Sequence, residues 1–153
     1  MTDLCCKVLQ ALEGKTFATA ESCTGGGIGA ALTGIPGSSR VYKGGIISYT
    51  NEVKNALLGV AAEVLEREGA VSAAVAEAMA VGARKALCAD VAVSVTGLAG
   101  PDGDDRGNAV GTVFIGYADE ARVISRKFLF SGTREEIRRA AGEAALYLVL
   151  EFH

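Results

Sequence analysis

The feature that most constrains this chain is a glycine-rich stretch between a strand-like and a helix-like segment. Residues 20–32 read AESCTGGGIGAAL and include Gly25, Gly26, Gly27 and Gly29. Each glycine within a helix costs about 0.5–1 kcal/mol relative to alanine, so four cost about 2–4 kcal/mol of a typical stability of ~5–15 kcal/mol. The stretch therefore predicts a turn where bare backbone is required.

The segments around this turn alternate between helix and strand patterns. Helices are predicted over residues 3–13, 27–33, 51–58, 62–68, 73–88 and from Thr133 onward, and strands over 16–20, 45–49, 91–95, 111–117 and 122–130. The run 91–95 (VAVSV) is apolar throughout, as in a strand buried on both faces. This order predicts an α/β fold, a three-layer α/β/α sandwich with a mixed, partly parallel sheet that ends in an antiparallel hairpin. We expect one domain over residues 1–153.

The net charge and the hydropathy of the chain disfavour some classes of binding partner. The formal net charge is −3 with no dense Lys/Arg run, which disfavours general binding to nucleic acid or to a membrane surface. No apolar run reaches the length of a membrane span, and residues 1–7 do not lead into a signal-peptide core. The sequence predicts a cytoplasmic protein. A small apolar-rich domain of this kind is compatible with a homo-oligomer.

The cysteines and the histidine restrict the chemistry. The four cysteines are Cys5, Cys6, Cys23 and Cys88, without a C-x-x-C pair. The adjacent pair suits no ordinary disulfide, and with one histidine there is no zinc pattern, so no metal is expected. That histidine, His153, ends the sequence, which leaves no credible imidazole for a Ser-His-Asp or Cys-His site. An acid–base group must then be Lys, Tyr, Asp or Glu.

Ser22 lies where the first strand turns into a helix. Unpaired N–H groups at such a turn favour an anion, and the glycines let it approach closely, so the turn suits a phosphate or the oxyanion formed when Ser22 attacks a carbonyl. The position resembles a nucleophile elbow but lacks G-x-S-x-G, and no Walker motif follows. A close helix–sheet crossing with Ser22 as a cap explains the stretch equally well.

Lys54 occurs in the segment YTNEVK, residues 49–54, at the start of a helix. The exits of parallel strands gather at one edge of a sheet, which would bring Ser22 and Lys54 together. A lysine early in a helix opposes the dipole, which lowers its pKa, and a neutral lysine can activate a serine without histidine. The alternative from this segment alone is a solvated surface lysine.

Two further segments are candidates for ligand contact. The segment TGLAGPDG, residues 96–103, follows the most apolar strand and exposes backbone, although a plain turn explains it too. Arg134 lies three residues before the inward-facing Ile137, so it is predicted at a helix N-terminus facing inward. That position needs an anion, either from a substrate or from an Asp or Glu of the protein. Arg138 and Arg139 are predicted to be solvated.

Taken together, AESCTGG, YTNEVK, TGLAGPDG, GTVFIGYA and FSGTREEIR resemble the CinA C-terminal domain family, in order, from about Leu4 to Leu150. The family includes stand-alone nicotinamide-nucleotide amidases, also called nicotinamide mononucleotide deamidases. The resemblance implies hydrolysis of nicotinamide mononucleotide to nicotinic acid mononucleotide and ammonia, in pyridine-nucleotide salvage, without a cofactor. It implies a nucleophilic Ser22, with Lys54 and Tyr49 as helpers, and Arg134 on the anionic end of the nucleotide.

The remaining substrate contacts are expected from the two glycine-rich segments. These candidates are Thr24, Gly25, Gly26, Thr96, Gly97, Ala99 and Gly100. The loop GPDGDDRGNAVGT departs from the family, since it has Asp104 and Asp105, and Asn108-Ala109 where Lys-Pro is common. The extra carboxylates are expected to weaken phosphate binding. Many relatives also carry an N-terminal domain resembling molybdopterin-binding proteins, whereas this sequence begins at the C-terminal module.

Two rival functions stay open. The first is a non-catalytic pyridine-nucleotide-binding module that uses the same glycine-rich turn and Arg134. The second is a thiol enzyme acting through Cys23, against which the missing histidine argues.

Overall fold

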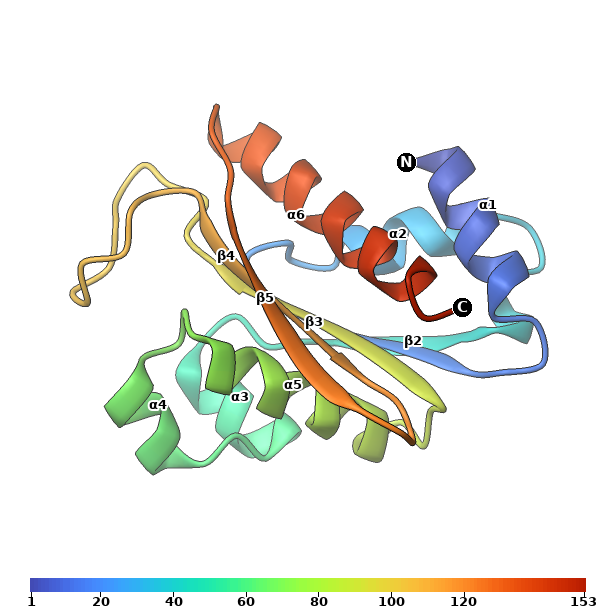
Figure 1. Ribbon diagram of the computed structural model, residues 1–153, viewed down its shortest axis with the longest axis horizontal. Helices are drawn as coiled ribbons and strands as arrows, with labels where there is room; N and C mark the ends of the chain where they lie inside the picture. The colour runs from blue at the N-terminus through green and yellow to red at the C-terminus, as the bar shows by residue number, and fades with distance from the viewer.

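The computed structural model, which describes residues 1–153, places one five-stranded sheet between two layers of helices (Figure 1). The strands are β1 Phe17–Glu21, β2 Tyr42–Ile47, β3 Val91–Gly97, β4 Thr112–Ala118 and β5 Val123–Leu129. Their order in the sheet is β2-β1-β3-β4-β5; β1 is parallel to both of its neighbours, while β4 runs antiparallel to β3 and β5. The predicted fold class, with a mixed sheet ending in a hairpin, is confirmed.

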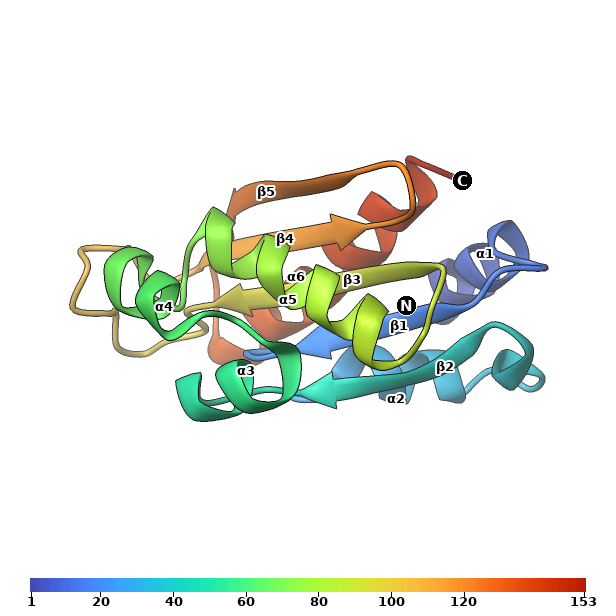
Figure 2. The same cartoon turned by 90° about the horizontal axis from the view of Figure 1, so that it is seen from below.

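The helices are α1 Thr2–Ala11, α2 Gly27–Thr33, α3 Asn51–Leu58, α4 Ala62–Glu68, α5 Ala73–Ala86 and α6 Arg134–Leu150, with a short 3₁₀ turn at Ser38–Arg40. Helices α1, α2 and α6 cover one face of the sheet, and α3, α4 and α5 cover the other, as Figure 2 shows from below. No helix combines the length and the apolar character needed to cross a lipid bilayer.

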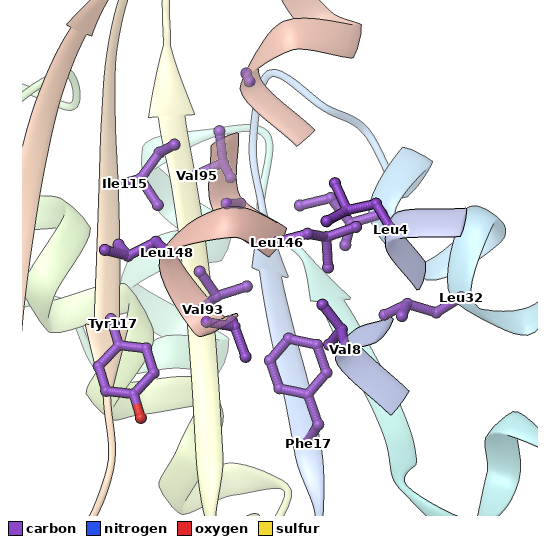
Figure 3. Packing of buried hydrophobic residues seen from close by; sticks show 14 of the residues in the cluster. Leu4, Val8, Phe17, Leu32, Val93, Val95, Ile115, Tyr117, Leu146 and Leu148 are labelled. Atoms are coloured by element: carbon purple, nitrogen blue, oxygen red, sulfur yellow. The ribbon is translucent and has the colours of Figure 1, made fainter. Parts of the chain in front are cut away.

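The larger part of the core lies between the sheet and the layer of α1, α2 and α6. Figure 3 shows side chains of α1 and α6, among them Val8 and Leu146, gathered over Phe17 of β1 and Val93 of β3. The opposite face has a smaller core, because the alanine-rich α5 lies close to the strands. A Cβ at Gly116 of β4 would collide with the Ala76 carbonyl of α5. The sheet is therefore packed against helices on both of its faces.

Side chains cap the starts of three helices. Thr50 caps α3, Ser72 caps α5, and Thr133 and Glu136 form a capping box at α6. The predicted strand over residues 45–49 is wrong at both ends, since β2 spans Tyr42–Ile47. Glycines within the strand hid its start, because glycine has low β propensity, and one of them is required there: a Cβ at Gly45 would collide with the Thr19 hydroxyl. Ser48 and Tyr49 therefore lie just beyond the strand.

Candidate active site

A cleft of about 900 Å³ opens where β1, β2 and β3 end. These three strands run parallel, so the segments that leave them meet at one edge of the sheet, where ligands of open α/β sheets bind. The lining of the cleft includes the sequence-predicted residues Ser22, Tyr49, Lys54, Thr96, Gly97, Ala99, Gly100 and Arg134. Three strand exits and the start of α6 thus converge on one cavity.

The centre of the cleft is a contact between Ser22 and Lys54. The Lys54 Nζ lies 3.0 Å from the Ser22 Oγ, and it donates to the carbonyls of Ser48 at 2.9 Å and Tyr49 at 3.2 Å. The lysine side chain is 1% exposed and forms no ion pair. Burial lowers the pKa of Lys54 to about 8. Burial, rather than the helix dipole invoked from the sequence, is the cause of this shift.

The partners of Lys54 orient its free electron pair. The two carbonyl oxygens only accept hydrogen bonds, so they use two of the amine hydrogens. The third direction of the nitrogen faces the Ser22 hydroxyl, as a donor in the ammonium form and as a lone pair in the neutral form. A neutral Lys54 is therefore placed to accept the Ser22 proton.

Tyr49 lies at the mouth of the cleft. Its carbonyl accepts from Lys54, but its side chain is 59% exposed, and its hydroxyl accepts from Nη2 of Arg134 at 3.2 Å. The hydroxyl forms no hydrogen bond with Ser22 or Lys54. The relay role expected for the Tyr49 side chain is thus not made by a direct hydrogen bond in this structure.

The start of α2 differs from the sequence interpretation. The carboxylate of Glu21 accepts from the N–H groups of Gly26 at 3.0 Å, Ile28 at 3.1 Å and Gly29 at 2.9 Å. The prediction that the glycines leave this helix terminus open to a ligand is wrong, because a side chain of the protein already fills it. Gly29 makes room for the Tyr42 hydroxyl, which a Cβ there would approach to 2.8 Å, whereas the Glu21 carboxylate would lie at an ordinary contact distance of 3.6 Å.

The positions of Thr24, Gly25 and Gly26 follow from this closure. None of the three lines the cleft. Gly25 and Gly26 lead into the start of α2, so Ser22 and Cys23 are the residues of this segment that line the cavity. Sequence reasoning missed Glu21. The available signal was an acidic residue at the last strand position before a glycine-rich helix start.

Two N–H groups next to Ser22 remain free of carbonyl partners. The N–H groups of Cys23 and Thr24 donate to no carbonyl of the protein, whereas the N–H of Gly25 closes the turn onto the Ser22 carbonyl at 3.0 Å. The backbone N–H groups without a carbonyl partner therefore lie one to two residues after Ser22 rather than at the start of α2.

Both arginines on this face of α6 contact loop carbonyls. Arg134 is exposed at the edge of the cleft, and its guanidinium donates to the Gly100 carbonyl as well as to Tyr49. It has no acidic partner, so its charge stays available to a ligand. Arg138 is exposed, as predicted, and its guanidinium also donates to the carbonyls of Cys23 and Thr24. Its spacing of four residues from Arg134 was the signal for a shared face.

The end of β3 and the loop after it supply backbone and carboxylates to the cleft. Thr96 is buried and donates to the Ala70 carbonyl at 2.8 Å, and Gly97 is required because a Cβ would lie 2.6 Å from Val113. Burial opposes ionisation of Asp104, yet hydrogen bonds from Asn108 and from backbone N–H groups hold its pKa below the usual value. Asp104 therefore shapes the loop. No group of three or more His, Cys, Asp or Glu side chains is arranged to hold a metal ion.

Cys23 lies beside Ser22 and also lines the cleft. Burial raises the pKa of its thiol to about 11, which keeps it protonated at neutral pH. A cysteine nucleophile needs the opposite shift, toward the thiolate. The electrostatics thus favour Ser22 over Cys23.

Comparisons with known proteins agree with the sequence resemblance. A family model described as the CinA C-terminal domain matches residues 2–153. The chain is 58% identical over 121 residues to a CinA-like protein of Thermosynechococcus vestitus, covering 78% of this chain and 29% of the relative. It is 50% identical over 135 residues to a CinA-like protein of Endomicrobium trichonymphae, covering 88% and 32%. The chain thus spans about a third of the length of these curated relatives.

Solved structures show the same fold. A competence-damaged protein (CinA) superfamily protein from Escherichia coli superposes with a TM-score of 0.97 at 32% identity, covering 99% of this chain and 90% of that one. The competence/damage inducible protein CihA from Agrobacterium tumefaciens gives a TM-score of 0.94 at 38% identity, covering 98% and 93%.

Proposed function

Since the chain belongs to the CinA C-terminal domain family, we propose that it is an amidohydrolase that converts nicotinamide mononucleotide to nicotinic acid mononucleotide and ammonia. The observation that carries the proposal is the contact of 3.0 Å between the Ser22 hydroxyl and the buried Lys54 amine inside the cleft. A serine beside a lysine with a lowered pKa is a nucleophile with its own base.

The first half of the reaction acylates Ser22. Its Oγ attacks the carboxamide carbon while neutral Lys54 takes the hydroxyl proton, which leaves a tetrahedral oxyanion. The N–H groups of Cys23 and Thr24, which have no carbonyl partner, receive that oxyanion. The Lys54 ammonium then passes its proton to the amide nitrogen, the C–N bond breaks, and ammonia leaves.

The second half releases the acid. A water molecule gives a proton to neutral Lys54 and attacks the ester carbon, and the same backbone donors receive the second oxyanion. Lys54 returns the proton to the Ser22 oxygen as the C–O bond breaks. The product carries a carboxylic acid in place of the amide, so one water is consumed for each ammonia formed.

Arg134 is the group we assign to the phosphate of the nucleotide. It lies at the edge of the cleft, carries no acidic partner, and is held in place through Gly100 and Tyr49. Tyr49 then acts on substrate position through Arg134. Three carboxylates on the same lining, Asp102, Asp104 and Asp105, add negative charge that opposes phosphate binding.

Ammonia release from nicotinamide mononucleotide by the purified protein tests this proposal. We expect Ser22→Ala to lose turnover by about 10³-fold or more, as for removal of a nucleophile, while circular dichroism and Tm show an intact fold. Binding of the nucleotide by calorimetry without any ammonia release in the wild type would instead favour a non-catalytic binding module. Full turnover by Ser22→Ala would contradict the assignment of the nucleophile.

A further inference from the structure

Arg138 is a charged residue that contacts the serine turn and that the mechanism above does not use. Its Nε donates to the Cys23 carbonyl at 2.9 Å, and its Nη2 donates to the Thr24 carbonyl at 3.2 Å. No acidic side chain pairs with it. The positive charge of the guanidinium is thus directed onto two consecutive peptide groups next to Ser22.

These contacts follow from the face of α6 that carries Arg138. Arg134 and Arg138 are four residues apart, so they lie on the same side of the helix. Arg134 binds the carbonyl of Gly100 in the loop after β3, and Arg138 binds the turn after β1. Arg139, the next residue, donates to neither loop and is exposed. The chain therefore contains its own matched control for the loss of one arginine at this end of α6.

Because a trans peptide is planar, the contacts of Arg138 with the two carbonyls also determine where the following N–H groups point. In a planar trans peptide the C=O and the following N–H point in opposite directions. With the Cys23 carbonyl on Arg138, the N–H of Thr24 is directed away from the guanidinium. With the Thr24 carbonyl on Arg138, the N–H of Gly25 is directed away as well, and it donates to the Ser22 carbonyl at 3.0 Å.

The turn is also shaped around the guanidinium. Gly25 has a φ of +59°, and a Cβ at this position would lie 3.3 Å from Nη2 of Arg138. A side chain there would strain the backbone and press on the arginine. Gly25 therefore lets Arg138 reach both carbonyls.

We propose that Arg138 is a positioning residue, which fixes the two peptide planes after Ser22 so that the Thr24 N–H faces the oxyanion formed at Ser22. The inference rests on the proposed function. A planar guanidinium donates to both carbonyls at once in a fixed geometry, whereas a lysine ammonium holds neither plane in the same way. The cation also polarises the peptides that it binds, which makes their N–H groups better donors.

The experiment compares Arg138→Ala and Arg138→Lys with Arg139→Ala in two assays. The first is the rate at which an alkyl fluorophosphonate modifies Ser22, where Oγ bonds to phosphorus, fluoride leaves, and the serine proton passes to Lys54. The second is kcat and KM for nicotinamide mononucleotide. We expect Arg138→Ala to lower the modification rate and kcat by about 10- to 100-fold with KM within about twofold, because an oxyanion donor is misplaced. Arg138→Lys is expected to fall between Arg138→Ala and the wild type, and Arg139→Ala to match the wild type.

Equal modification rates in Arg138→Ala and Arg139→Ala would overturn the proposal. If the alanine variant does not fold, Arg138→Lys decides: a wild-type rate overturns the proposal, and a reduced rate with unchanged KM supports it. A wild type that is modified at Ser22 but releases no ammonia contradicts the proposed substrate, while the modification rates still decide the role of Arg138. If Ser22 is not modified at all, hydrogen exchange over residues 22–27 decides, and faster exchange in Arg138→Ala alone supports the positioning role.

Discussion

Glu21 and Lys54 are the only acidic and basic side chains among the buried residues, and they lie at the same edge of the sheet on opposite faces. Glu21 is 2% exposed and Lys54 is 1% exposed. The carboxylate of Glu21 accepts from three N–H groups of α2 and its approach, and from the Thr19 hydroxyl at 3.4 Å. Every one of these partners belongs to the protein, so Glu21 stabilises the fold and has no contact with the cleft.

Lys54 has equal burial but a different third partner. Two of its contacts are backbone carbonyls, and the third is a hydroxyl on the wall of the cleft. A proton can move between the amine and that hydroxyl, whereas the N–H donors around Glu21 do not release theirs. The comparison teaches that burial alone does not identify a catalytic group. Its partners, and whether one of them meets the cavity, separate a structural charge from a reactive one.

The largest effect is expected from removal of the lysine amine. Lys54→Met should lower kcat by about 10²–10⁴-fold, the usual loss when a general base is removed. The two carbonyls lose a donor, but the buried amine no longer has to be desolvated, so the folded state should persist. Initial rates of ammonia release, with Tm measured on the same samples, check this. A variant that keeps wild-type kcat would show that the contact with Ser22 is structural, like those of Glu21.

The next effect is a loss of stability at Glu21. Glu21→Gln puts an amide NH₂ against N–H donors in either orientation, and we expect the free energy of unfolding to fall by about 2–4 kcal/mol. The exposed Glu13→Gln should change it by less than about 0.5 kcal/mol. Urea unfolding measures both. If Glu21→Gln instead abolished turnover without loss of stability, the roles assigned to the two buried groups would be reversed.

Local signals in the sequence predicted most of the fold. Caps such as Thr50 and Thr133 depend on side chains within three residues of the helix start, so they can be read without knowing the tertiary structure. The meeting of Ser22 with Lys54 followed from one topological rule, because parallel strands end at a common edge. That prediction needed only the order of the elements.

The contacts of Arg138 and Glu21 could not be predicted from the sequence, because they depend on which residues the fold brings next to these side chains. Helical periodicity gives the face of Arg138, but its partners are 115 and 114 residues away in the chain, and nothing local indicates them. Glu21 was missed for another reason. A charged residue in an apolar strand is ordinarily unfavourable, and its burial is stable here only because a turn with positive φ at Gly25 and Gly26 brings the N–H groups of α2 onto the carboxylate.

The pH dependence of the rate further tests the difference between the structural Glu21 and the proposed base Lys54. Burial lowers the pKa of Lys54 from the ordinary 10.5 to about 8, and the proposed mechanism uses the neutral form as the base. We expect kcat/KM to fall about tenfold per pH unit below this pKa and to level off above it. Stability changes with pH in the same direction as the rate. Between about pH 8 and 10.5, Lys54 holds a proton in the unfolded chain but not in the folded one. The contribution of Lys54 to the free energy of unfolding therefore rises with pH over this range. Unfolding of the wild type and Lys54→Met across that range isolates this contribution. A flat rate profile would remove Lys54 as the base.

The smallest effect is expected at Cys23, the other nucleophile near the lysine. The hydrogen bond of the amine goes to Ser22, and burial raises the pKa of the Cys23 thiol to about 11. Cys23→Ser should lower kcat by less than about tenfold, or 1.4 kcal/mol of barrier, because the Ser22 hydroxyl stays in place. The buried hydroxyl that replaces the thiol should lower the free energy of unfolding by about 1–3 kcal/mol. Ammonia release by Cys23→Ser and Ser22→Ala under the same conditions separates the two nucleophiles. If Cys23→Ser released no ammonia while Ser22→Ala remained active, the nucleophile that gives its proton to Lys54 would be the Cys23 thiol.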